Sequence, residues 1–234
     1  MVTFREAMSD SDQKWIKKQK VYFVSTAPLT KSGHVNLSPK GYDGLRILDS
    51  NRMLLLDGRG SGCETVAHVR ENGRLTVMMC AFEGGPRIVR LFSTGTVHEP
   101  GSTEFSSLFA EHYAADWDNP DKINFVRSII DVKVHMVAQS CGYGVPLMAF
   151  KDERRTLTDC FKTKPGEVVG KRSPLINSRS IDGIPSLLNG TADATRVAVF
   201  KRRFIIAAQS AVPWVGGAAL GAAIALAAVK KVFA

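Results

Sequence analysis

The stretch Gly58-Arg59-Gly60-Ser61-Gly62 is the first place in the sequence where residue types and spacing point to ligand chemistry. It follows an apolar run that predicts a strand, and it leads into Cys63–Glu71, whose apolar residues have helical spacing. Backbone N–H groups at a helix start, the Ser61 hydroxyl and the Arg59 guanidinium together suit a phosphate group. A flexible turn with a serine helix cap explains the same residues, so both interpretations stay open.

Two further clusters have the chemistry to bind an anion. A predicted strand ends in Ser38-Pro39-Lys40-Gly41, which offers a hydroxyl and an ammonium group. Arg87 and Arg90 follow Gly84-Gly85-Pro86, but a spacing of three on a strand places the two side chains on opposite faces. They can serve one site only if a bulge intervenes or the site lies at a dimer interface. A pair of surface arginines is the alternative.

The other reactive residues predict neither a metal site nor a nucleophile. The five histidines are scattered, and none pairs with a second His or Cys at metal-ligand spacing. The four cysteines contain no C-x-x-C pair, which favours reduced thiols; they are Cys63, Cys80, Cys141 and Cys160. No G-x-S-x-G, P-loop or dinucleotide-binding motif is present. We therefore expect no metal, and no side chain stands out as an obligatory acid or base.

Short apolar runs predict the elements that must position these clusters. Alternation and β-branched residues predict six strands, at 21–27, 34–37, 52–56, 75–82, 87–97 and 128–137. Helices are expected after Ser9-Asp10-Ser11-Asp12, over Cys63–Glu71 with Asn72-Gly73 as its end, and over Thr103–Tyr113. The apolar run at 75–82 predicts burial on both faces, and Gly95 predicts a bulge or a bend. Short connections favour antiparallel pairing, and closure into a barrel would protect the edges.

The net charge of +9 is unevenly distributed over the 234 residues, which hold 31 Lys and Arg against 22 Asp and Glu. No acidic residue follows Asp193, whereas six basic residues do. Residues 1–193 therefore hold 31 less six, or 25, basic residues against the 22 acidic ones. This near balance excludes a generally basic domain, and we expect no nucleic-acid partner.

The positive excess surrounds one apolar segment near the C-terminus. Phe204–Val229 carries no charge and lies between Lys201-Arg202-Arg203 and Lys230-Lys231. As a helix, its 26 residues are long enough to cross a hydrocarbon layer of ~30 Å, and basic flanks are typical of membrane spans. An apolar helix buried in a soluble core or a dimer interface is the alternative. Residues 1–20 contain no apolar targeting segment. We expect a cytosol-facing domain over 1–193 and, over 194–234, a tail that anchors it to an intracellular membrane.

Five motifs in order give the sequence a specific resemblance. Asn36-Leu37-Ser38-Pro39-Lys40-Gly41 and Gly60-Ser61-Gly62-Cys63-Glu64-Thr65-Val66-Ala67-His68 resemble the pyridoxamine 5′-phosphate oxidase-like proteins with the FMN-binding split barrel. Phe82–Leu91, Ser140–Pro146 and Ser180–Pro185 continue the resemblance, which runs from about Ile16 to Leu188. It indicates a bacterial and fungal subfamily rather than the true oxidase, whose pyridoxal-phosphate-binding residues and C-terminal region are not matched.

The resemblance implies a fold, a cofactor and a set of binding residues. The fold would be mainly β with α, a six-stranded antiparallel split β-barrel that forms a homodimer and binds FMN at the dimer interface. Ser38, Pro39 and Lys40 would lie along the flavin and reach its polar edge. Arg59 and the turn and helix start with Ser61, Glu64 and Thr65 would hold the phosphate. Arg87 and Arg90 match the arginine pair that lies near the flavin of the partner subunit.

The expected function follows from this resemblance. The protein would be an FMN-dependent oxidoreductase that exchanges a hydride between flavin N5 and a small organic substrate. Lys40 would stabilise the reduced ring electrostatically. The alternative is a non-catalytic flavin- or tetrapyrrole-binding module at a membrane, because a fold does not fix a function.

Overall fold

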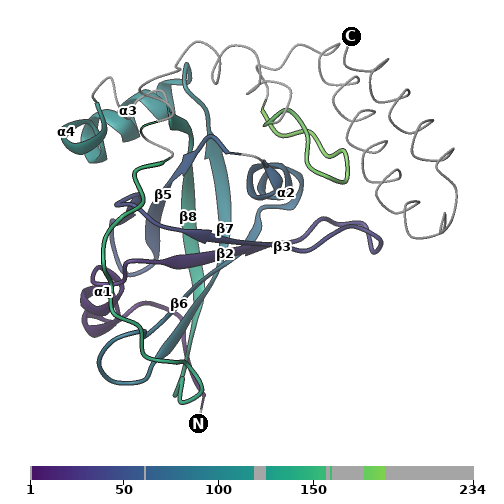
Figure 1. Ribbon diagram of the computed structural model, residues 1–234. Helices are drawn as coiled ribbons and strands as arrows, with labels where there is room; N and C mark the ends of the chain where they lie inside the picture. The colour runs from purple at the N-terminus through teal and green to yellow at the C-terminus, as the bar shows by residue number, and fades with distance from the viewer. Residues whose placement is uncertain (1, 61, 119–124, 157–158, 160–176, 188–234) are drawn as a thin grey trace, which may run out of the picture.

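The 15-residue strand β8 (Val126–Ser140) organises the sheet, since it pairs along its length on one side and in two parts on the other. Its first neighbour is β7 (Ile88–His98). On the opposite side β5 (Arg52–Gly58) and β1 (Thr3–Arg5) pair with its two halves. The computed structural model in Figure 1 describes residues 2–60, 62–118, 125–156, 159 and 177–187.

The other strands extend this sheet on both sides. They are β2 (Tyr22–Thr26), β3 (Asn36–Lys40), β4 (Leu45–Ile47) and β6 (Arg74–Cys80). The order β3-β2-β6-β7-β8-β5-β4 contains only antiparallel neighbours. Within the described residues β3 and β4 are the two ends of this path, so the sheet is a curled half-barrel that the strand ladder does not close.

The sequence predicted six strands, and the described part of the chain contains eight. All six predicted strands are present, and β1 and β4 are additional. Each of these two has three residues, too few for a period-2 pattern to be visible. They form because neighbouring strands offer unpaired edges: β4 pairs with β5, and β1 pairs with the end of β8 that β5 leaves uncovered.

The described part of the chain contains four helices: α1 (Asp10–Ile16), α2 (Glu64–Asn72), α3 (Thr103–His112) and α4 (Ala114–Trp117). Helix α1 begins with a capping box, in which Ser9 and Asp12 satisfy each other's backbone N–H groups. Helix α2 ends at Gly73, whose φ of 73° is the left-handed conformation predicted for this position. Helix α2 lies against β2, β3, β6 and β7, which buries its residues from Thr65 to Val69.

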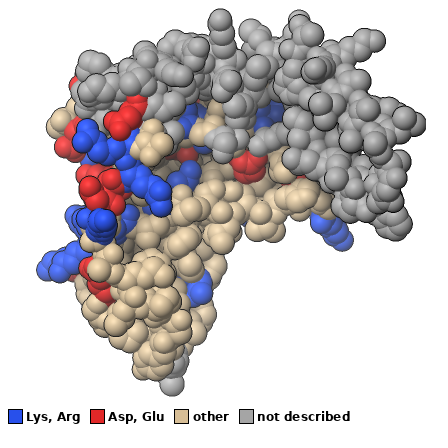
Figure 2. All heavy atoms as spheres, in the orientation of Figure 1, with Lys and Arg blue, Asp and Glu red and all other residues tan. Residues whose placement is uncertain are grey.

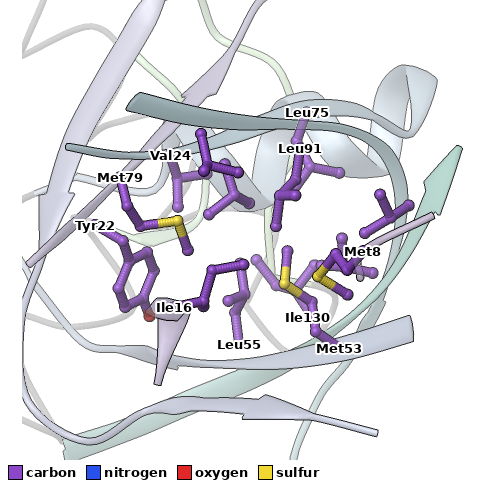
Figure 3. Close-up of a cluster of buried hydrophobic side chains, with 14 of the residues drawn as sticks. Met8, Ile16, Tyr22, Val24, Met53, Leu55, Leu75, Met79, Leu91 and Ile130 are labelled. Carbon is purple, nitrogen blue, oxygen red and sulfur yellow. The ribbon is translucent and has the colours of Figure 1, made fainter. Parts of the chain in front are cut away.

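The main core lies between facing parts of the curled sheet, where apolar side chains from both sides meet (Figure 3). A second apolar cluster fills the space under α3 and α4. The prediction that the strand at 75–82 is buried on both faces is wrong. Val77 and Met79 of β6 are fully buried, but Thr76 and Met78 on the opposite face are half-exposed, and on that face only Cys80 at the end of the strand is buried.

Gly95 serves packing rather than a bulge. The register shift in β7 lies between Phe92 and Ser93 instead. A Cβ atom at Gly95 would lie 3.0–3.2 Å from side chains of Leu75, Ile130 and Val69, so the glycine lets α2 approach the sheet closely.

Several sequence-based expectations fall outside the described residues. These are the position of Ser61, the apolar segment Phe204–Val229 and the boundary of the tail at 194. Within the part of the chain that is described, no helix is both long and apolar enough to span a membrane.

A pair of glycine substitutions tests the packing of the glycine-rich loop. A Cβ atom at Gly58 would overlap the Phe125 ring, whereas a Cβ atom at Gly60 would meet no atom within 4 Å. Phe125 is buried with Trp117, so it has little room to move. We expect Gly58→Ala to lower the free energy of unfolding by about 1–3 kcal/mol, as measured by urea denaturation. Gly60→Ala is the matched control, and equal losses in both variants would contradict this view of the loop.

Candidate functional site

Strand β3 places the predicted ligand-binding side chains by simple alternation. In the ladder with β2, Lys40 pairs with Tyr22, Ser38 with Val24 and Asn36 with Thr26. All three β2 residues are buried. Asn36, Ser38 and Lys40 therefore face the inner side of the curled sheet and are half-buried, whereas Leu37 and Pro39 face outward and are exposed. Because β3 is an edge strand, its inner-facing side chains can be reached from solvent.

Lys40 is held in place by a buried carboxylate that the sequence analysis did not identify. Its Nζ atom lies 3.2 Å from Oδ1 of Asp57, the residue before the glycine-rich loop, and Asp57 is 2% exposed. The other carboxylate oxygen, Oδ2, accepts a hydrogen bond of 2.7 Å from Nε of Arg127, which is 3% exposed. These three residues form the Lys40–Asp57–Arg127 triad, which has a net charge of +1.

Electrostatics keep Asp57 and Arg127 ionised. Burial alone would raise the pKa of Asp57, but the charges and hydrogen bonds of Arg127 and Lys40 outweigh it and lower the pKa to about 2. Burial would likewise lower the pKa of Arg127, yet the adjacent Asp57 carboxylate raises it. The site therefore keeps a fixed positive excess, which favours an anionic or electron-rich ligand.

A β-bulge makes this contact possible. In the β5–β8 ladder Asp57 pairs with Ser128 and Gly58 with Val126, so Arg127 is the extra residue on β8. Both Arg127 and Ser128 then reach the same carboxylate, with Ser128 Oγ 3.4 Å from Oδ2.

Arg127 also fixes the glycine-rich loop. Its Nη1 atom donates to the Gly62 carbonyl at 2.7 Å and to Oδ1 of Asn177, and the Asn177 amide donates to the Gly60 carbonyl at 3.4 Å. The predicted phosphate-binding turn is thus attached to the same ion pair that holds Lys40.

The start of α2 meets β3 through a neutral hydrogen bond. Asn36 Nδ2 donates to Oγ1 of Thr65 at 3.0 Å, which joins the predicted phosphate region to the strand that carries Ser38. Glu64, beside Thr65, accepts a hydrogen bond of 3.2 Å from the backbone of Ile181 through Oε1, so it fastens the 177–187 segment. Ser38, Lys40 and Thr65 therefore lie around one inner face.

Arg59 adds positive charge at the same end of the sheet. Its backbone N–H donates to the Phe125 carbonyl at 2.8 Å. Burial and the nearby charge of Arg127 lower the pKa of its guanidinium. Two guanidinium groups thus share this region, which an anion would stabilise.

The structure does not bring Arg87 and Arg90 into this cluster within one chain. Arg87 forms an ion pair with the fully buried Asp12, donates to Gln139 at 2.9 Å, and lies 4.8 Å from the centre of the Trp15 ring. Arg90 lies on the outer face of the sheet, where its Nη1 atom is 3.4 Å from Ser140 Oγ. The two arginines therefore point to opposite sides of β7, as their spacing indicates.

Arg90 and Pro39 share a row that crosses the outer face. The strand register aligns them with residues from β2, β6, β8 and β1, in the order Pro39, Phe23, Met78, Arg90, Ala138 and Phe4. Phe4 is 65% exposed, and Leu37 beside Pro39 is 63% exposed. This row is thus mostly apolar, with Arg90 near its middle.

A cleft of about 1110 Å³ opens at the end of β3, beside Lys40. Trp15, Phe82 and Phe150 are among its aromatic lining residues, and Lys40 and Arg87 are among its cations. In Figure 2 charged side chains of both signs gather along one edge, on the side where Figure 1 places α1 and the 141–156 segment. The cleft brings Arg87 to the same opening as Lys40, although the two do not touch.

One wall of the cleft is the segment 148–154, which is fastened at both ends. Met148 N donates to the Phe82 carbonyl at 2.8 Å, and Phe150 N donates to Glu83 Oε1 at 2.9 Å. At the far end the Tyr42 hydroxyl donates to the Arg154 carbonyl at 2.8 Å. The cleft thus has a defined wall.

Substitution of the buried carboxylate tests the triad. Asp57→Asn leaves Arg127 without its counter-charge in a buried position, so we expect a loss of about 3–5 kcal/mol in the free energy of unfolding. The matched control is Asp131→Asn, which breaks the more exposed pair with Arg52 and should cost less than about 1 kcal/mol. Urea denaturation at pH 7 measures both.

The triad also predicts a pH dependence. The pKa of Asp57 is lowered to about 2 in the folded protein from its usual 3.8, so the stabilisation by its carboxylate is present above about pH 4. It is lost as the pH falls through the folded pKa. Between pH 5 and pH 2 the free energy of unfolding should therefore fall by about 2 kcal/mol less in Asp57→Asn than in the wild type. Parallel stability curves for the two proteins would contradict this.

No protein-family model matches the chain. Three solved structures resemble parts of it at low similarity. HupZ of Group A Streptococcus has 16% identity and a TM-score of 0.42, covering 55% of this chain and 92% of that one. An FMN-binding protein from Syntrophomonas wolfei has 14% identity and a TM-score of 0.39, with coverages of 57% and 82%. A FAD-binding protein from Mesorhizobium loti has 13% identity and a TM-score of 0.37, with coverages of 59% and 97%. At TM-scores below 0.5 these structures add nothing to a family assignment.

Sequence similarity gives a firmer result. The chain is 35% identical over 219 residues to the pyridoxamine 5′-phosphate oxidase family protein ustO of Aspergillus flavus, and the match covers 82% of this chain and 81% of that protein. This agrees with the motifs at 36–41 and 60–68, which build the inner face around β3 and α2. The chain therefore belongs to the pyridoxamine 5′-phosphate oxidase family.

Proposed function

We propose that the protein binds FMN along β3 and is a flavin-dependent oxidoreductase acting on a small organic substrate. The observation that carries the proposal is the line of groups on the inner face of β3. Lys40, fixed by Asp57, stands at one end, and Asn36, bonded to Thr65 at the start of α2, stands at the other. These positions are four residues apart, or roughly 13 Å along a strand. That span suits a flavin ring at Lys40 and a phosphate at the helix start.

The residues present fit such a ligand. The triad has a net positive charge, and the start of α2 offers backbone N–H groups together with the Arg59 region. When bound, the flavin supplies hydride exchange at N5. Lys40 contributes positive charge near the ring, which favours its reduced form. The cleft beside Lys40 is the route by which a small organic substrate reaches the ring, and its aromatic walls exclude water from that contact.

The outer face supports a homodimer. Phe4 and Leu37 are exposed there, with half-exposed Phe23, Met78 and Phe92 between them. A second copy that covers this row would remove its exposed apolar side chains from water. It would also place Arg90 and Pro39 at the interface, where one subunit's arginine can approach the other subunit's ligand.

Flavin binding is tested directly on the purified protein. We expect it to be yellow, or to bind added FMN with a change in flavin absorbance. Lys40→Met should weaken FMN binding by at least about tenfold, whereas Lys133→Met, which removes an exposed lysine on β8, should not. A wild-type protein that neither contains nor binds flavin would contradict the proposal. Bound flavin that no nicotinamide or deazaflavin donor reduces would instead favour a non-catalytic binding module.

We also propose that Phe204–Val229 anchors the protein in an intracellular membrane, with the flavin-binding part on the cytosolic side. The support is the uncharged length of this segment and its basic flanks. A lysine in place of either Leu220 or Ile224 would make the free energy of membrane insertion less favourable by about 2.5–3.5 kcal/mol near a bilayer centre. We expect Leu220→Lys with Ile224→Lys to move the full chain from the membrane pellet to the supernatant. The control with Leu220→Val and Ile224→Val should stay in the pellet.

A further inference from the structure

His68 is a buried titratable residue that the proposed function does not use. It lies on α2, is 0% exposed, and has its Nδ1 atom 3.0 Å from Thr26 Oγ1 on β2. Its other ring nitrogen, Nε2, is also buried and has no hydrogen-bond partner among the described residues. Burying a polar ring lowers the stability of the fold unless a hydrogen bond compensates, and Thr26 makes the one hydrogen bond that the described residues give this ring.

That contact is the end of a chain of hydrogen bonds that reaches the candidate site. Asn36 Nδ2 donates to Thr26 Oγ1 at 3.1 Å, and Ser38 Oγ donates to Asn36 Oδ1 at 2.8 Å. We call these four residues the Ser38–His68 relay. The pairing of Thr26 with Asn36 and of Val24 with Ser38 places the three relay residues of β2 and β3 on one face.

Counting protons gives one consistent direction for the relay. Both Asn36 amide protons are used, one on Thr26 and one on Thr65. Thr26 accepts from Asn36 through one lone pair, and its single hydroxyl proton is then available to His68 Nδ1, 3.0 Å away. With Thr26 as the donor, Nδ1 is unprotonated and a neutral His68 carries its proton on Nε2. Burial, the largest influence, lowers the pKa of His68, which agrees with a neutral ring.

The same count fixes what Ser38 can offer to a ligand. Its hydroxyl proton is committed to Asn36 Oδ1, so only oxygen lone pairs remain toward the site. If the Asn36 amide were reversed, its nitrogen would donate to Ser38 and the serine proton would become free to donate. Thr26 would then need an imidazole N–H from His68, which the Nε2–H form does not provide.

We propose that His68 is a positioning residue that acts through Thr26 and Asn36 to hold the Ser38 hydroxyl as a hydrogen-bond acceptor toward the ligand. The site then selects a ligand that presents an N–H or O–H group to Ser38. This inference rests on the proposed function: in an oxidised flavin ring the only N–H donor is N3–H, between two carbonyl groups. A ring oriented with this edge toward Ser38 would meet an acceptor there and the Lys40 ammonium beside it.

The first arm of the test needs no flavin. The nitrogen chemical shifts of ¹⁵N-histidine-labelled full-length protein report which ring nitrogen of His68 carries the proton, with His68→Asn used to assign the signal. We expect the neutral Nε2–H form. A neutral Nδ1–H form, or a protonated ring at pH 7, would mean that Thr26 does not donate to His68, and it would overturn the proposal whether or not flavin binds.

The second arm is a double-mutant cycle on the dissociation constant for FMN. His68→Leu removes the acceptor at the end of the relay and should weaken FMN binding by about five- to tenfold. His68→Asn keeps an acceptor oxygen near the Nδ1 position and should stay within about threefold of the wild type. In a Ser38→Ala background, His68→Leu should cause no further loss of FMN affinity, because the hydroxyl through which the relay contacts the ligand is already absent.

Two controls separate this role from general packing. Thr26→Val keeps the shape of the side chain but breaks the relay, so it should match His68→Leu. Val66→Ala opens a cavity at a fully buried neighbour on α2 and should lower stability without changing the FMN dissociation constant. Equal losses of affinity in His68→Leu and Val66→Ala, or additive losses for His68→Leu and Ser38→Ala, would overturn the proposal. A wild-type protein that binds no FMN would instead remove the proposed function and leave the first arm valid.

Discussion

The buried ion pair between Asp57 and Arg127 is the constraint on which the candidate site depends. Both residues are almost completely excluded from water, so each needs the other to remain charged. The pair joins β5 to β8, and through Arg127 it holds the carbonyl groups of the glycine-rich loop. Through Asp57 it holds Lys40 at the open end of β3. One charge pair thus sets the position of the loop and of the cation that faces the ligand.

Two different polar systems meet on the inner face of β3. The triad is charged and sets the electrostatic preference of the site for an anionic or electron-rich group. The relay from Ser38 to His68 is neutral and sets the direction of a hydrogen bond. The two systems share no side chain, although Lys40 and Ser38 are only two residues apart on the same strand face. Affinity and orientation can therefore be controlled by separate residues, a division that suits a site for a planar ligand with distinct edges.

The position of β3 explains why these groups remain accessible. Most inner-facing side chains of the sheet are covered by the opposite part of the curl or by α2. Strand β3 is at the end of the sheet path, so its inner row is covered on one side only. The outer face of the same strand carries exposed apolar residues. An edge strand of this kind has one row for a ligand and another for a partner, which ties ligand binding to dimer formation.

Sequence alone determined the elements and the residue types of the site. Alternation located six strands, the glycine after α2 ended a helix, and the motifs around Ser38, Lys40 and Thr65 marked positions that the fold brings to one face. A carboxylate that ends an apolar strand just before a glycine-rich loop was a visible signal for Asp57. Arg127 gave no comparable signal, because nothing local distinguishes it from a structural arginine. Asn36 and His68 stand inside the two family motifs, but their residue types alone did not assign them a role.

Only the tertiary structure decided which of these groups act together. Arg127 reaches Asp57 because of a bulge, and a bulge depends on the register between two strands about 70 residues apart. His68 reaches Ser38 through residues of β2 and β3, whose pairing with each other and packing against α2 are long-range. Arg87 and Arg90 lie on opposite faces, as their spacing predicted. The sequence did not show that Arg87 contacts Asp12 and Trp15 of α1, or that Arg90 lies on the outer face. Sequence periodicity records which face of an element a residue occupies, whereas the partner on that face depends on how distant segments pack.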